Sequence, residues 1–156
     1  MCDLEKLRLT FRPESIVTLF VGESPPHNGT FFYKGNSVLY FSVKESFGGT
    51  ANFLAEFKAK CFFLDDLVLY PVNKLNKKER EENQWKGVAS LAQRMAVYGP
   101  AAVVVLMCAI EEMVVDAMSK AGLSHVPHFV TPFPGRYHRG RFREKMAEII
   151  PKLPTC

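Results

Sequence analysis

Short apolar runs recur along the chain and are separated by segments with a helical period. The runs cover residues 16–21, 61–64, 101–107 and 127–130. Apolar runs of this length that end at glycine or polar residues are typical of strands buried on both faces of a sheet. We therefore expect four buried strands.

The segments between these runs place apolar residues three and four positions apart, as amphipathic helices do. We expect helices over residues 50–59, around the stripe of Trp85, Val88, Ala92 and Met95, over residues 110–118, and around Phe142, Met146, Ile149 and Ile150. Gly122 and Pro151 are placed to end the last two. Strands that alternate with helices predict an α/β fold, a three-layer sandwich with a four-stranded, mainly parallel sheet.

Length and charge fit one domain over residues 1–156. A chain of 156 residues that is 47% hydrophobic can fill one core, and two independent cores are not expected. The net charge of +4 permits a polyanionic partner without requiring one. In the charged segment 73–82 both signs mix, which favours a solvated loop and a first helical turn over a lysine cluster that contacts phosphate.

The cysteines at positions 2, 61, 108 and 156 lack the close spacing of zinc or iron–sulfur ligands. Because the N-terminus shows no secretory leader, we expect reduced, buried thiols and no disulfides. The longest apolar run is far shorter than the roughly 20 residues that span a bilayer. These observations predict a cytoplasmic protein without a membrane partner, and we expect a monomer.

Motifs for common catalytic groups are missing. His27 and His138 do not make a metal-ligand pattern, and the chain has neither a serine-nucleophile elbow nor a phosphate-binding glycine loop. We therefore expect no metal and no cofactor.

The loop after the first strand combines rigidity with polar groups. Pro25 and Pro26 fix the backbone behind Glu23 and Ser24. This turn either aims the two polar side chains into a site or uses them to bind nearby backbone amides. The aromatic segment 29–36 that follows either stacks on a planar ligand or covers the core.

Two further strand ends carry candidate chemistry. Asp65 and Asp66 end the second strand, where a buried carboxylate needs a dedicated partner or ligand, unless it caps a helix or shapes a turn. After the fourth strand, four arginines, His138 and two aromatics lie within residues 136–143. Because cations oppose the dipole at a helix N-terminus, a phosphate partner is favoured here over a merely solvated helix start.

Together these loops resemble the uracil-DNA glycosylase superfamily over roughly residues 15–150. The first motif, Gly22-Glu23-Ser24-Pro25-Pro26, is closest to the mismatch-specific and thermophilic-type branches, and the segment 29–39 resembles the family's glycine-to-aromatic segment. The resemblance implies a four-stranded parallel sheet between helices. It also implies that Phe32 stacks on a flipped base.

The resemblance assigns further residues to roles. Asp65 or Asp66 stands where the family reads the base, and residues 132–139 stand where it enters the DNA minor groove. The implied catalytic residues are Glu23, Ser24 and His138; those implied to bind the base are Phe32, Asp65, Asp66 and Asn36; those implied to bind DNA phosphates are Arg136, Arg139 and Arg141.

The chain departs from the family where the chemistry takes place. Ser24 replaces a water-positioning aspartate or asparagine, an aspartate replaces the uracil-reading asparagine, and Phe133 replaces a histidine or asparagine. The iron–sulfur cysteines are missing. An aspartate that accepts hydrogen bonds pairs with a ring N–H or an exocyclic amine, so base choice is expected to differ from uracil.

Two functions follow as hypotheses. The first is a monofunctional DNA glycosylase that removes a damaged or non-canonical base after flipping it out of the helix. The second is a non-catalytic module that keeps the fold and binds DNA, RNA, a free base or a nucleotide.

Overall fold

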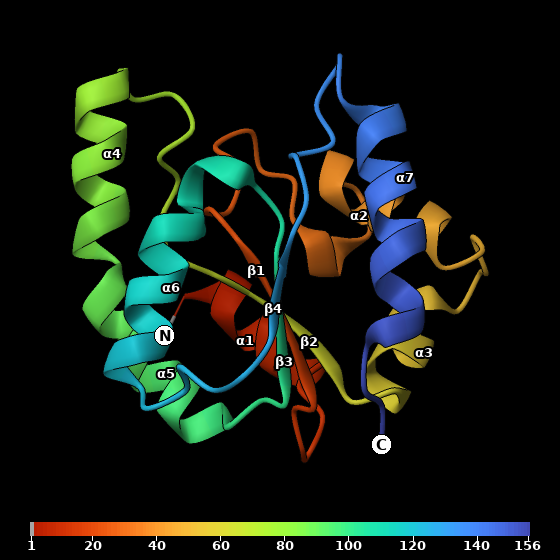
Figure 1. Ribbon diagram of the computed structural model, residues 1–156. Helices are drawn as coiled ribbons and strands as arrows, with labels where there is room; N and C mark the ends of the chain where they lie inside the picture. The colour runs from red at the N-terminus through yellow and green to blue at the C-terminus, as the bar shows by residue number, and fades with distance from the viewer. Residues whose placement is uncertain (1) are drawn as a thin grey trace.

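The structure, a computed structural model, describes residues 2–156 and has an α/β architecture (Figure 1). Four strands form one parallel sheet in the order β2-β1-β3-β4. The strands are β1 (Thr18–Gly22), β2 (Phe62–Asp66), β3 (Ala102–Val105) and β4 (His128–Val130). The chain runs outward from β1 to β2 and then crosses to β3, so the strand order reverses between β1 and β3.

Helices cover both faces of the sheet. On one side α5 (Val88–Tyr98) and α6 (Glu111–Lys120) pack together, with α4 (Lys77–Lys86) against α5. The other side carries α2 (Val38–Ser46), α3 (Phe53–Ala59) and α7 (Arg139–Ile149). Short 3-10 helices are η1 (Phe32–Lys34), η2 (Cys108–Ile110) and η3 (Ile150–Lys152). None of the helices within residues 2–156 combines the length and apolarity needed to cross a membrane.

The four expected strands form, but the expected burial was wrong for β4, at the sheet edge, where His128 is exposed and Phe129 and Val130 are half-buried. Every residue of β1, β2 and β3 is buried, because helices press on both faces of these strands. The predicted helices around residues 50–59, 110–118 and 142–150 also form, and Gly122 follows α6 with the left-handed φ of +75° that ends such helices.

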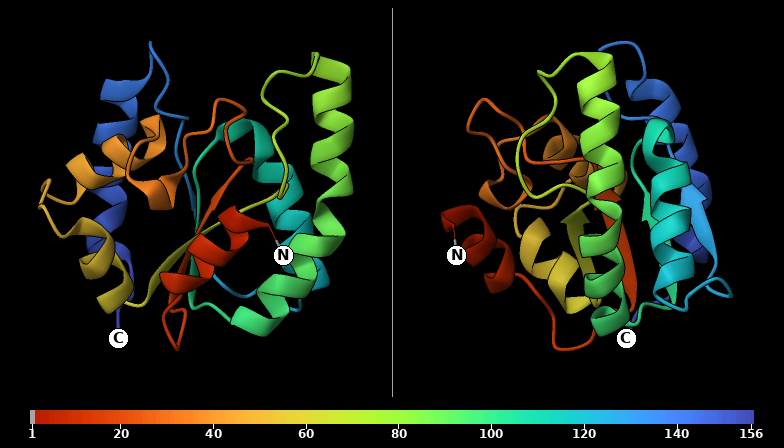
Figure 2. Two further views of the ribbon diagram at one scale, coloured as in Figure 1. Left: turned by 180° about the vertical axis from the view of Figure 1, so that it is seen from behind. Right: turned by 90° about the vertical axis from the view of Figure 1, so that its left-hand side faces the viewer.

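An N-terminal helix that the hydrophobic pattern did not predict, α1 (Asp3–Thr10), lies beyond the β2 edge of the sheet (Figure 2). Its Arg8 is 1% exposed and donates to the Leu64 carbonyl at 3.1 Å. The Tyr33 hydroxyl donates to the same carbonyl at 2.9 Å and accepts from the Leu64 N–H at 2.7 Å. Arg8 and Tyr33 thus satisfy the open backbone groups of an edge strand, and burial raises the pKa of Tyr33.

The charged segment 73–82 forms more helix than expected. Asn76 accepts from the Glu79 N–H at 2.9 Å and so caps α4, which extends through Lys86. Gly87 stands between α4 and α5. A side chain does not fit at this position, because a Cβ would lie 2.6 Å from the Leu67 carbonyl oxygen. Trp85 therefore belongs to α4 and is 38% exposed, and the predicted stripe holds only for Val88, Ala92 and Met95.

The absence of disulfides was a wrong expectation. Cys61 and Cys156 form a disulfide, with their Cα atoms 5.7 Å apart and a separation of 95 positions in sequence. Cys2 and Cys108 are free, and both are exposed instead of buried. Sequence spacing did not reveal the pairing because the contact depends on the C-terminus returning to the start of β2. The prediction of a reducing compartment consequently loses its main support.

We expect loss of this disulfide to lower the free energy of unfolding by about 2–4 kcal/mol, because the long loop that it closes restricts the unfolded chain. Cys156→Ser, followed by urea denaturation, measures the effect. Cys2→Ser removes an exposed free thiol and serves as the control. Equal urea midpoints for Cys156→Ser and the wild type would show that the disulfide contributes nothing to stability.

Candidate functional site

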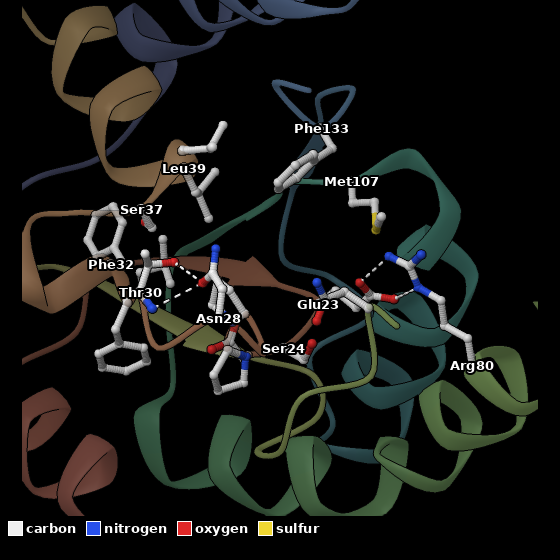
Figure 3. Close-up of a pocket in the computed structure, with 17 residues that line it drawn as sticks. Glu23, Ser24, Asn28, Thr30, Phe32, Ser37, Leu39, Arg80, Met107 and Phe133 are labelled. Carbon is white, nitrogen blue, oxygen red and sulfur yellow. Dashed lines mark hydrogen bonds and ion pairs between the residues drawn. The ribbon is translucent and has the colours of Figure 1, made fainter. Parts of the chain in front are cut away.

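A cavity of about 270 Å³ opens at the carboxyl ends of the strands, where the strand order reverses (Figure 3). This is the usual ligand position in open parallel sheets, and the volume is near the lower end of the range for small-molecule sites, ~300–1,000 Å³. Loops after all four strands contribute to its wall, among them those that carry Glu23, Asn73, Met107 and Phe133, and Asp66 lines it from the end of β2.

Glu23, directly after β1, is held by α4. Its carboxylate accepts two hydrogen bonds from Arg80, at 2.6 and 2.5 Å, and a third from Gln84 at 2.6 Å. Arg80 and Gln84 lie four residues apart and therefore face the same side of the helix. Hydrogen bonding to Glu23 raises the pKa of Arg80. The carboxylate is fixed and its charge is neutralised by a guanidinium at the cavity wall.

Ser24 and Asn28 add neutral polar groups to the cavity. The Ser24 hydroxyl oxygen accepts a long hydrogen bond of 3.4 Å from the Val72 N–H, which leaves its own O–H available. The Asn28 side-chain oxygen accepts from the Thr30 N–H at 3.1 Å and the Thr30 hydroxyl at 2.7 Å. These two bonds set the amide orientation, so the Asn28 NH₂ group points away from Thr30 toward the space that the labelled side chains surround (Figure 3).

Two aromatic rings lie on opposite sides of the cavity (Figure 3). Phe32 is only 4% exposed and packs against four other rings, those of Tyr33, Tyr40, Phe53 and Phe57. Phe133 is 39% exposed, so most of the ring area free for a ligand belongs to it. The aromatic segment after β1 therefore covers the core, as one of the two alternatives predicted, and its buried Phe32 also forms part of the cavity wall.

The two neighbouring aspartates have different positions. Asp66 lines the cavity, whereas Asp65 points into a buried charge cluster between α1 and α5. Asp65 pairs with Arg94 at 2.6 Å and Arg8 at 3.6 Å, and accepts from the Tyr98 hydroxyl at 2.7 Å. Burial alone favours the neutral acid, but these cations and the hydroxyl lower the pKa of Asp65.

The pKa of Asp66 shifts in the opposite direction from that of Asp65. Burial raises its pKa above the ordinary 3.8; Arg8 opposes this, while Asp65 and Glu5 add to it. Arg8 is shared among all three carboxylates, with Asp66 at 2.9 Å and Glu5 at 3.2 Å. Burial works against the Arg8 cation, yet the surrounding carboxylates raise its pKa. Arg8 therefore remains charged and ties α1 to the cavity floor.

Other residues expected at the site lie elsewhere. Asn36 is exposed, and its side-chain oxygen accepts from the Phe31 N–H at 2.9 Å, so it shapes the loop and not the cavity wall. The exposed group on the loop before α7 and in the first turn of α7 also does not line the cavity: Arg136, His138, Arg139 and Arg141. Glu23, Ser24, Phe32 and Asp66 are the expected site residues that the fold brings together.

Three residues of the site were not singled out from the sequence: Asn28 and Arg80, which line the cavity, and Gln84, which binds Glu23 from behind the wall. The Asn28-Gly29-Thr30 order is typical of a turn in which a side-chain amide binds the backbone two residues on, and this signal was available. The i, i+4 spacing of Arg80 and Gln84 was visible too. Their partner was not, because it lies about sixty residues earlier in the chain.

No protein-family model matches this chain, and no curated protein matches it significantly. Within residues 2–156, no three histidine, cysteine, aspartate or glutamate side chains are grouped as metal ligands would be.

Proposed function

We propose that this protein is a DNA glycosylase-like enzyme with a uracil-DNA glycosylase-like fold, which accepts a flipped nucleobase in the cavity. One observation supports this most strongly. The cavity has an aromatic ring on each of two opposite sides, and fixed polar groups from Asn28, Ser24 and Asp66 between them. A flat heterocycle with polar edges fits such a cavity, because the aromatic side chains can stack on the faces of the heterocycle and the polar groups can form hydrogen bonds with its edges.

The loop after β4 supports DNA as the source of the base. Phe133, on this loop, lines the cavity, and Arg136, Arg139 and Arg141 follow in the exposed segment beyond it. No carboxylate of residues 2–156 forms a salt bridge with any of these three arginines. Arg143, by contrast, pairs with Glu45. Arginines that are free of acidic partners can bind phosphates on either side of a flipped nucleotide.

N-glycosidic cleavage requires little general-base strength, because the sugar develops positive charge before water attacks it. The Ser24 O–H and the one acceptor position that remains on the Glu23 carboxylate are suited to orient that water. Asp66 faces the base and is treated below. His138 lies outside the cavity, so our proposal gives it no part in the chemistry.

A panel of duplex oligonucleotides, each with one damaged or deaminated base, tests this proposal. We expect abasic product from at least one substrate under single-turnover conditions. Phe133→Ala should reduce the rate by about 10–100-fold, since stacking on one aromatic ring contributes ~1–3 kcal/mol per base. Phe41→Ala removes a ring that is 52% exposed on α2 and should leave the rate unchanged. No abasic product at stoichiometric protein across the panel would exclude the enzyme.

A second candidate is a module that binds DNA, RNA, a base or a nucleotide without cleaving it. The binding of Glu23 by Arg80 and Gln84 favours it, because three hydrogen bonds and a neutralising guanidinium weaken a carboxylate as a water-activating group. Binding that falls steeply with salt, without release of a base, would support this candidate over the first.

A further inference from the structure

Asp66 has one carboxyl oxygen bound and one oxygen open to the cavity. Its Oδ2 accepts from Arg8 at 2.9 Å, whereas its Oδ1 accepts no hydrogen bond from residues 2–156. The backbone groups are occupied: the N–H donates to Asp65 Oδ1 at 2.8 Å, and the carbonyl accepts from Arg94 at 2.9 Å. The residue is 4% exposed, and Oδ1 is not among the fully buried polar atoms without a partner, so it borders the cavity space, where a ligand can bond to it.

Gly22 leaves the space that this oxygen uses. A Cβ at position 22 would lie 2.7 Å from Asp66 Oδ1, closer than side chains tolerate. Gly22 is the register partner of Asp66 across β1 and β2. The missing side chain therefore lets Oδ1 reach the cavity wall at the strand ends.

Burial, and not the balance of nearby charges, is the main cause that favours a proton on Asp66. Glu5 and Arg8 face it from α1, and Asp65 precedes it on β2. Arg94 of α5 neutralises Asp65 at its other oxygen, Tyr33 of η1 is uncharged, and Glu23 across the cavity is paired with Arg80. Two carboxylates and one guanidinium thus act on Asp66 directly. Burial raises the pKa of Asp66 most, Arg8 opposes this, and Asp65 and Glu5 add smaller contributions in the direction of burial.

We propose that Asp66 binds the ligand as a neutral carboxylic acid that donates through Oδ1–H, and that Arg8 is a positioning residue which fixes the carboxyl through Oδ2. The proton belongs on Oδ1 because Oδ2 faces a guanidinium that only donates. The inference rests on the proposed function for the identity of the ligand, but not for the state of Asp66.

This state changes what the site recognises. An ionised aspartate would repel a carbonyl oxygen, whereas a neutral acid donates to one, or to a ring nitrogen without hydrogen. Asn28 contributes a second donor from its NH₂ group. As the glycosidic bond breaks, negative charge builds on the departing base, and a donated hydrogen bond stabilises that charge without transfer of the proton.

Infrared difference spectroscopy between the wild type and Asp66→Asn tests the protonation state without any ligand. We expect the carbonyl band of a protonated carboxyl in the wild type at pH 7, absent from Asp66→Asn and lost as the pH is raised. Should the variant fail to fold, carboxyl-carbon NMR of wild-type protein, titrated between pH 4 and 9, reports the same group. An Asp66 carboxyl that is fully ionised at pH 6 would overturn the proposal.

A second readout assigns the role of Arg8. Arg8→Lys keeps the positive charge but removes the planar guanidinium that donates to Asp66 Oδ2. The fold should persist, and the pH at which Asp66 loses its proton should move. An unmoved midpoint would contradict a positioning role. If a nucleobase binds, wild-type affinity should fall about tenfold per pH unit above that midpoint, and Asp66→Asn affinity should stay flat. Absence of base binding would count against the proposed function alone.

Discussion

Arg8→Met is expected to lower the free energy of unfolding by about 3–5 kcal/mol. The side chain is 1% exposed and bonds to Asp66, to Glu5 and to the Leu64 carbonyl, with Asp65 at 3.6 Å. Removing one partner of a buried charge cluster costs more than the pair contributes, because the ionised Asp65 and the polar oxygens of Asp66 and Leu64 remain in the interior without Arg8. Urea denaturation at pH 7 measures the loss, and Lys6→Met on the exposed face of α1 provides the control.

The pH dependence separates this explanation from simple loss of packing. Without Arg8, the folded-state pKa of Asp66 rises further above 3.8, and that of Asp65 rises from its lowered position because one of the two cations that lower it is gone. A raised folded pKa means that stability is greatest below the unfolded pKa and falls as the pH rises through the folded one. Arg8→Met should therefore regain part of its deficit between pH 7 and about pH 4. A deficit that is constant over this range would show that the charges are not its cause.

Gly22→Ala should weaken binding of a flipped base by about 100-fold. The added methyl group would lie 2.7 Å from Asp66 Oδ1, and the carboxyl cannot turn away freely because Arg8 holds its other oxygen. A displacement of about 1 Å in such a site commonly costs two orders of magnitude. Fluorescence titration with a duplex that carries one mismatched 2-aminopurine measures the affinity of the wild type and the variant.

Gly140→Ala is the matched control for this substitution. Gly140 lies in α7, has no heavy atom within 4 Å of an added Cβ, and is not part of the cavity. Gly140 is the second residue of α7, so alanine there should raise stability by less than about 1 kcal/mol and leave the affinity unchanged. Equal affinity for Gly22→Ala and Gly140→Ala would show that Oδ1 does not face the ligand.

The sheet could be predicted from the sequence because its strands are buried on both faces and so appear as unbroken apolar runs. The helices that lie on the sheet show their apolar stripes for the same reason. By contrast, α1 and α4 are held mainly by charges: buried Arg8 anchors the first, and Arg80 with Gln84 joins the second to Glu23. Hydrophobic periodicity carries no signal for such contacts.

The candidate site could also be predicted only in part. Glu23, Ser24, Phe32 and Asp66 were predictable because they end strands or follow them, and strand ends meet at one edge of a parallel sheet. The sequence could not distinguish Asp65 from Asp66, since adjacent residues in a strand point to opposite sides and only the packing of α1 and α5 decides which side holds the cavity. His138 and Asn36 lie in the right loops but outside the cavity.

The most direct measurement of the central claim is the fluorescence of 2-aminopurine in a duplex titrated with protein. Entry of the base into the cavity takes it out of the stack, so we predict a saturable signal that Phe133→Ala and Gly22→Ala weaken and Phe41→Ala preserves. Unchanged fluorescence at saturating protein, or a signal that both cavity variants retain in full, would contradict the account of this cavity as a nucleobase pocket.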